Sequence, residues 1–230
     1  VSEIKTSSQK TRLIPFTFST TQTYILEFGN NYIRFYKDKG QILSGGSAYE
    51  IASPYATSEL FDIKFAQSAD VMYLCHPNHD VRKLSRSGHT SWTLATVSFT
   101  GSPSPAISGA DNRPSCVSFF EQRLVFANTN NNPQTLFFSK SGDYENMTTG
   151  TNADDAMIYT IASNQVNAIR FLKAQRTLIV GTTGGEFTVS ADGTDAAITP
   201  TNIAIKRQSS YGSANVDAQP AGNATLFLQR

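Results

Sequence analysis

Short apolar runs separated by polar turn residues recur along the chain, and one outline is repeated four times. In each copy an aromatic residue precedes two apolar runs with a polar break between them, and a glycine turn closes the copy. The glycine follows the leading aromatic residue by 22 or 23 positions, whereas successive glycines are 48 to 54 positions apart. The variable lengths therefore fall between copies, where loops tolerate insertions. We expect the leading residues to lie in the core of the repeats and the closing glycines to form structural turns. The leading residues are Phe18, Phe65, Phe120 and Phe171, and the closing glycines are Gly40, Gly88, Gly142 and Gly193.

Each copy predicts antiparallel β-strands. The apolar runs are short, rich in β-branched and aromatic residues, and bounded by Gly, Asn, Asp and Pro, which is the pattern of half-buried strands. Pairs such as Gly29-Asn30 and Gly184-Gly185 stand between two runs, and residues that tolerate positive φ favour a hairpin there. A further weakly apolar segment follows each closing glycine, so that one copy accounts for about four strands.

We therefore predict an all-β protein, a β-propeller-like array of four-stranded antiparallel blades. A four-stranded unit cannot cover both of its faces alone, so neighbouring units must stack on it. We expect a single domain over residues 1–230, with units at about 11–60, 61–110, 111–160 and 161–210 and a partial fifth unit at 211–230. An irregular β-sandwich is the alternative fold. Because the chain opens with Val1 and stops at Arg230 within the fifth unit, we expect it to be an internal fragment of a longer polypeptide.

Composition and charge agree with this fold and exclude one class of function. Charged residues make up 16% of the chain, below the usual quarter, as is typical of all-β proteins rather than of helical bundles. Nineteen Lys and Arg against 18 Asp and Glu give a net charge of +1, which excludes a polycationic nucleic-acid clamp. Cys75 and Cys116 are too few for a disulfide framework. We expect two buried thiols, although they could form one bridge.

The densest group of candidate metal ligands is the segment Cys75-His76-Pro77-Asn78-His79-Asp80, with four possible ligands in six residues. Zinc requires three or four ligands that converge at about 2.0–2.3 Å, and no second Cys/His cluster accompanies this one. We interpret the segment as a polar turn after a buried strand. The sequence therefore predicts no metal site and no cofactor.

No catalytic residues are predicted, and we expect that the protein is not an enzyme. The sequence contains no Gly-x-Ser-x-Gly nucleophile motif. Asp154-Asp155 is the only adjacent acidic pair, and we expect it to lie in a solvated loop. A sialidase-like hydrolase would need an arginine cluster, which we do not expect Arg34, Arg82 and Arg170 to form.

The amino-acid sequence of the repeats, and not only their spacing, carries a resemblance to a known family. It covers nearly the whole chain, and none of its motifs is a catalytic motif. The resembling stretches are residues 13–19, 24–29, 32–36, 65–72, 117–124, 139–144, 161–169 and 208–216. In these stretches the chain resembles the tail nozzle family, also called tail tubular protein B, of short-tailed bacteriophages.

The resemblance implies a structural protein of the virion tail that is assembled in the cytoplasm of the bacterial host. It implies a ring, a hexamer in the family, below the head-to-tail adaptor. The implied partners are other copies of the chain, the adaptor, and further tail proteins or tail fibres, with no membrane. Genome DNA would pass through the lumen without sequence-specific binding, and a near-neutral protein leaves few cationic groups to hold its phosphates.

Two further expectations concern surfaces. Lys206, Arg207 and Tyr211 are candidate interface residues, because a basic pair near an aromatic ring could contact phosphate or an acidic partner; a solvated strand edge is the other interpretation. The alternative function is a receptor- or glycan-binding β-propeller module. Such a module would use exposed aromatic side chains as stacking platforms, namely Tyr49, Tyr55, Trp92 and Tyr144.

Overall fold

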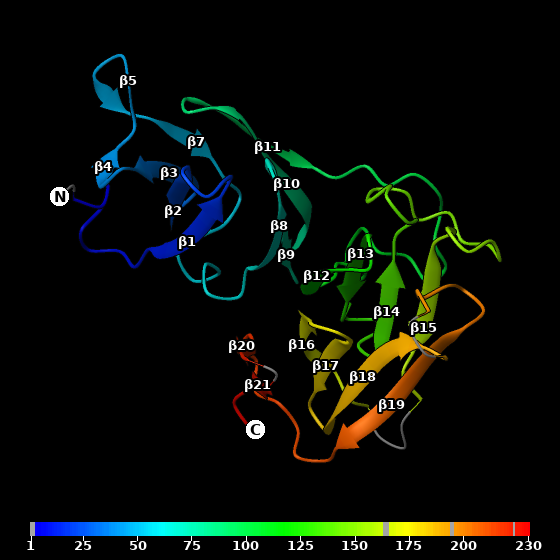
Figure 1. Ribbon diagram of the computed structural model, residues 1–230. Helices are drawn as coiled ribbons and strands as arrows, with labels where there is room; N and C mark the ends of the chain where they lie inside the picture. Colours follow the sequence, from blue (N-terminus) through cyan, green and yellow to red (C-terminus); the bar gives the residue numbers. More distant parts are fainter. Residues whose placement is uncertain (1–2, 163–165, 194–195, 223) are drawn as a thin grey trace. The chain divides into compact units, whose positions relative to one another are not determined.

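The computed structural model describes residues 3–162, 166–193, 196–222 and 224–230, and in these ranges the protein consists of β-strands and loops (Figure 1). None of the described residues forms a helix of the length and apolarity needed to span a membrane. Residues 163–165, within one of the stretches that carry the family resemblance, lie outside the described ranges. The chain divides into two compact units, Val1–Leu74 with Val81–Thr96 and Cys75–Asp80 with Val97–Arg230.

The first unit is built on two antiparallel sheets whose main strands follow one another in sequence order. One sheet contains β1 (Arg12–Thr17), β2 (Thr23–Gly29), β3 (Tyr32–Lys37) and β4 (Gly40–Gln41), with β7 (Glu50–Ala52) also paired to β3. The other contains β8 (Lys64–Ser68), β9 (Val71–His76), β10 (His79–Gly88) and β11 (Ser91–Thr96). A small ribbon of β5 (Leu43–Ser44) and β6 (Ser47–Ala48) lies between β4 and β7 in the sequence.

One apolar cluster joins these two sheets. Alternate residues of a strand point to the same face, and the pairing places Leu26 of β2 opposite both Ile14 of β1 and Phe35 of β3. All three side chains are fully buried. The second sheet adds Leu74 and Leu84 to the same cluster. Each sheet therefore covers the apolar face of the other.

The second unit repeats this construction. One sheet contains β12 (Cys116–Phe120), β13 (Arg123–Ala127), β14 (Thr135–Phe138) and β15 (Met157–Thr160). The next contains β16 (Ile169–Ala174), β17 (Leu178–Thr182), β18 (Gly185–Ala191) and β19 (Ile203–Ser209), and Figure 1 shows these four strands side by side in chain order. A two-stranded ribbon of β20 (Gln219–Ala221) and β21 (Ala224–Leu226) follows.

The two sheets of the second unit share one core and meet at their first strands. Val125 and Phe138, paired between β13 and β14, pack in the same cluster as Val180 and Phe187, paired between β17 and β18. β12 lies against β16, where the Cys116 thiol is 3.7 Å from the carbonyl oxygen of Ile169. The first strands of consecutive sheets are therefore neighbours.

The prediction of an all-β protein with several four-stranded antiparallel sheets is confirmed, while the first large sheet carries β7 as a fifth strand. The leading aromatic residues of the four copies occupy different environments. Phe120 and Phe171 are 4% and 0% exposed and Phe65 packs at the margin of the core, whereas Phe18 is 36% exposed. Phe18 follows the end of β1 and lies under the Arg86 guanidinium, 4.2 Å from the ring centroid. Its ring therefore stacks on a cation at the surface and does not fill the core.

The four closing glycines differ in whether their backbone conformation requires glycine. Gly142 has φ of +73° and Gly193 has φ of +137°, conformations that side chains other than glycine rarely adopt. Gly40 begins β4 after Asp38 and Lys39, which themselves take the positive φ values of that turn. A Cβ atom on Gly88 would meet the Ser91 side chain at 3.6 Å, an ordinary contact. Glycine is therefore needed at Gly142 and is replaceable at Gly88.

We predict that Gly142→Ala lowers the free energy of unfolding by about 1–2 kcal/mol, because alanine must take the left-handed conformation. The matched substitution Gly88→Ala should change it by no more than about 0.5 kcal/mol. Urea denaturation of the two variants measures both effects. Equal losses in the two variants would contradict this assignment of the turns.

Candidate functional site

The segment with the most candidate ligands forms the tip of the β9–β10 hairpin. β9 ends at His76, Pro77 and Asn78 make the turn, and β10 begins at His79. His76 is 2% exposed, and the backbone N–H of Asn78 donates a hydrogen bond to its Nδ1 at 3.1 Å. The two imidazole rings lie 5.1 Å apart, measured between centroids. The turn was anticipated from the sequence, and it brings the two rings together at one end of the hairpin.

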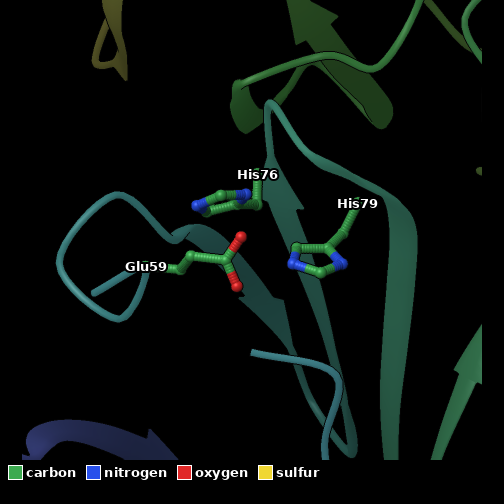
Figure 2. A group of neighbouring side chains, drawn as sticks. All are labelled: Glu59, His76 and His79. Atoms are coloured by element: carbon green, nitrogen blue, oxygen red, sulfur yellow. The ribbon is translucent and has the colours of Figure 1, made fainter. Parts of the chain in front are cut away.

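Figure 2 shows the imidazole rings of His76 and His79 at this end of the hairpin. Glu59 is in the turn before β8, where one carboxylate oxygen accepts a hydrogen bond from the backbone N–H of Ala56 at 2.9 Å.

The other two candidate ligands of the segment serve the protein itself. Burial raises the pKa of the Cys75 thiol well above its usual range, and the neighbouring Cys116 raises it further. This thiol therefore stays protonated, and the thiolate is the form that binds metals. Asp80 accepts hydrogen bonds from the backbone N–H of Gly109 at 3.0 Å and from Nε of Arg113 at 3.2 Å. Asp80 thus holds a neighbouring loop.

The expectation for the cysteines is met, since both are buried thiols that form no disulfide.

The second unit contains a cleft of about 870 Å³. Its ionisable groups include Glu121, Arg123 and Asp154. Glu121 accepts a hydrogen bond from the backbone N–H of Ile198 at 2.6 Å. Asp154 is 3.2 Å from the Lys140 ammonium. These charged groups are engaged with the protein's own loops, so the cleft does not present a set of uncommitted catalytic side chains.

Arg123 is the most deeply buried charge in the second unit, at 1% exposed. Its guanidinium donates to the carbonyl oxygens of Ser139 and Asp155, each at 2.7 Å, and of Ala153 at 2.5 Å. Burial lowers the pKa of Arg123, while nearby acidic residues, Asp154 first, oppose this effect. Arg123 therefore anchors the loop that precedes β15 through its main chain.

The acidic pair of that loop, Asp154-Asp155, does not lie in the environment that we expected. Asp155 is 8% exposed, not solvated, and accepts a hydrogen bond from the Lys140 ammonium at 3.0 Å. That hydrogen bond, followed by one from the backbone N–H of Asn152, lowers the pKa of Asp155. The expectation of a solvated pair is therefore wrong for Asp155, because a lysine from the preceding turn covers it.

The first unit buries a carboxylate in a different way. Glu27 is 1% exposed and accepts a hydrogen bond from the Tyr32 hydroxyl at 2.6 Å and another from the Tyr36 hydroxyl. Burial, followed by the hydrogen bond to Glu27, raises the pKa of Tyr36 to about 12. Both phenols therefore stay protonated and serve as donors. The arrangement compensates the buried charge with hydrogen bonds.

The four proposed stacking platforms are packed side chains. Tyr55 is 0% and Trp92 is 6% exposed, and the Trp92 ring stacks on Phe35 with centroids 4.5 Å apart. Tyr49 and Tyr144 are half-buried, and the Tyr49 hydroxyl accepts a hydrogen bond from the backbone N–H of Trp92. The expectation of exposed rings is therefore wrong for Tyr55 and Trp92, which the first core recruits for their large apolar area.

The candidate interface residues lie on and after the edge strand β19. Lys206 and Arg207 are exposed, and Tyr211 is 67% exposed. Arg207 donates to the carbonyl oxygen of Gly184 at 2.7 Å, which fixes the β17–β18 turn to the edge strand. Lys206 and Tyr211 are therefore the members of this group whose side chains face outward.

No family model fits this chain, and no curated protein is significantly similar to it.

We predict that Arg123→Met lowers the free energy of unfolding by about 3 kcal/mol, because several buried carbonyl groups lose their donor at once. Arg207→Met is the matched control, since Arg207 also binds main-chain carbonyls but is exposed. It should cost no more than about 0.5 kcal/mol. Urea denaturation of both variants tests this, and a similar loss in both would refute the anchoring role of Arg123.

The Lys140–Asp155 contact predicts a pH dependence. The pKa of Asp155 is lowered in the folded protein, so its contribution to stability is complete above the ordinary aspartate range and is lost as the pH falls through the lowered value. Lys140→Met returns the Asp155 pKa toward its ordinary value. The variant should therefore lose less stability than wild type between about pH 5 and pH 2, as measured by urea denaturation at each pH. If the free energy of unfolding fell equally with pH in wild type and in the variant, the contact would not contribute measurably to stability.

Proposed function

We propose that this chain is a structural module of a bacteriophage tail, a propeller-like part of the nozzle ring through which the genome is ejected. In this role it is a scaffold without catalysis of its own. Two observations support the proposal, namely the family resemblance of the sequence and the order of the strands in the sheets.

The observation that carries the proposal is the strand order. All four large sheets are meanders in which the principal strands follow each other in sequence, β1 to β4, β8 to β11, β12 to β15 and β16 to β19. In Greek-key sandwiches the chain crosses between the two sheets. In a propeller each blade is one meander of four consecutive strands. The order found here therefore favours blades over the sandwich.

The contact between β12 and β16 supports the same arrangement. In a propeller the first strand of each blade faces the central axis, so that the first strands of consecutive blades are neighbours. β12 and β16 are the first strands of consecutive sheets and lie against each other. We propose that further sheets continue this stacking until the ring of blades closes.

The charges of the protein suit a scaffold around DNA. The net charge is +1, and few surplus cations remain to bind phosphate, so a duplex can move past without being retained. Several charged groups are used internally. Arg123 and Glu27 bind the protein's own groups, and Glu186 accepts hydrogen bonds from the serine hydroxyls of Ser213 and Ser209. Such groups stiffen loops rather than present chemistry to a ligand.

A ring of identical copies requires one heterologous interface that repeats until it closes. The edge strand β19 offers an exposed basic residue, Lys206, and the segment that follows it offers an exposed aromatic ring, Tyr211. Aromatic side chains are enriched in protein interfaces. We place these residues in a contact with a second copy or with another tail protein.

The test uses the full-length protein. Light scattering should give the mass of a closed ring of several copies. Antibodies against the chain should label particles at the tail, below the adaptor, in negative-stain images, and antibodies first absorbed with the purified chain should give no label. A monomer at all concentrations, together with particles that carry no label on the tail, would overturn the proposal.

A further inference from the structure

We propose that the cleft of the second unit binds an extended segment of a partner protein that carries a basic residue. The cleft has a volume of about 870 Å³, which lies within the size range of ligand-binding pockets. Its lining comes from the β12–β13 and β16–β17 turns and from the loops that follow β14 and β18. The proposal depends on this cleft alone and is independent of the role in a phage tail.

The lining combines buried apolar side chains with hydroxyl groups. Ala191 and Ile198 are 8% and 3% exposed. A hydroxyl group donates one hydrogen bond and accepts others, so it can pair with either the N–H or the C=O of a peptide backbone. The hydroxyl groups of the lining belong to Ser141, Thr177, Ser190 and Thr199.

Hydrogen bonds between loops fix the walls of the cleft. The backbone N–H of Ile198 donates to the Glu121 carboxylate at 2.6 Å, which joins the β18–β19 loop to the β12–β13 turn. The Asn202 side chain accepts a hydrogen bond from the backbone N–H of Thr199 at 2.7 Å and donates one to the carbonyl oxygen of Ala197 at 3.0 Å. A ligand therefore has few loops to order when it binds, and this preorganisation favours affinity.

The side of the cleft formed by the sheet of β12 to β15 carries an excess of negative charge. Glu121 and Asp154 line it, and the Asp154 side chain is 61% exposed. Asp154 and Asp155 share one ammonium group, that of Lys140, at 3.2 Å and 3.0 Å. All three carboxylates act electrostatically on the buried Arg123. Three carboxylates thus face two cations, and a basic group of a ligand would meet the remaining negative charge.

The same lining favours a peptide over two other ligand classes. Carboxylates at the opening repel the phosphate groups of a nucleic acid. Among the described residues that line the cleft none is aromatic, so a sugar ring would find no stacking platform. The exposed Arg176 belongs to the β16–β17 turn of the other sheet, and its guanidinium can donate to the main-chain carbonyl groups of a peptide.

The test is fluorescence polarisation of a short labelled alanine peptide with one central lysine, titrated with the purified protein at low ionic strength. A peptide with glutamate in place of the lysine is the comparison. We expect saturable binding of the lysine peptide, with the glutamate peptide weaker by about tenfold, and a loss of affinity with added salt because exposed charges are screened. The proposal is wrong if the lysine peptide does not bind, if the glutamate peptide binds equally well, or if a labelled DNA strand or oligosaccharide occupies the cleft instead.

Variants locate the binding in the cleft. Glu121→Gln and Asp154→Asn remove a charge but keep a hydrogen-bond acceptor, and each should weaken binding of the lysine peptide by about tenfold. Ala197→Trp should abolish binding, because the indole ring fills the cleft. The matched controls should leave binding unchanged, namely Asp38→Asn, at a side chain 77% exposed in the first unit, and Ala110→Trp, at an exposed alanine of another loop.

A second measurement separates lost binding from lost folding. Each variant is compared with wild type by circular dichroism and urea denaturation without peptide, and Asp154→Asn should unfold at nearly the same urea concentration as wild type because Asp154 is exposed. Binding that survives both Ala197→Trp and Asp154→Asn, or that falls equally in the two controls, would overturn the proposal.

Discussion

Each unit of this protein depends on mutual covering of apolar sheet faces. In a four-stranded meander, one face carries large apolar side chains that the strands of the same sheet cannot shield from water. Leu26 and Phe35 are such side chains in the first unit. The partner sheet supplies the cover with Leu74 and Leu84. Small sheets need such packing to be stable, so each sheet of a unit depends on the other for stability. Loops between sheets do not contribute comparable apolar packing. Their lengths therefore vary, while the spacing inside each copy stays constant.

Local structure was predictable from the sequence because hairpins are local. The turns at Asn30-Asn31 and Pro77-Asn78, and the one that ends at Gly185, fall where the turn residues indicated, and the apolar runs on either side became paired strands. In such pairs both partners lie within a few residues of the turn, so composition and spacing are sufficient. The four-stranded sheets follow from these hairpins with little further information.

Contacts between distant segments were not predictable, because nothing in the local pattern encodes them. Trp92 lies in a strand of alternating polar residues, yet its ring is buried on Phe35. Asp155 looks like half of a solvated pair and is instead covered by Lys140. Phe18 begins a repeat but stacks on Arg86 at the surface. In each case a partner far along the chain determined the outcome.

The choice of acceptors by Arg123 has a consequence for how this protein can evolve. Its guanidinium holds the loop before β15 by main-chain oxygens and by no side chain of that loop. Backbone carbonyls are present whatever residue occupies the position. Natural selection can therefore replace most side chains of this loop, and so change which partners the loop contacts, while the hydrogen bonds from Arg123 still hold its main chain.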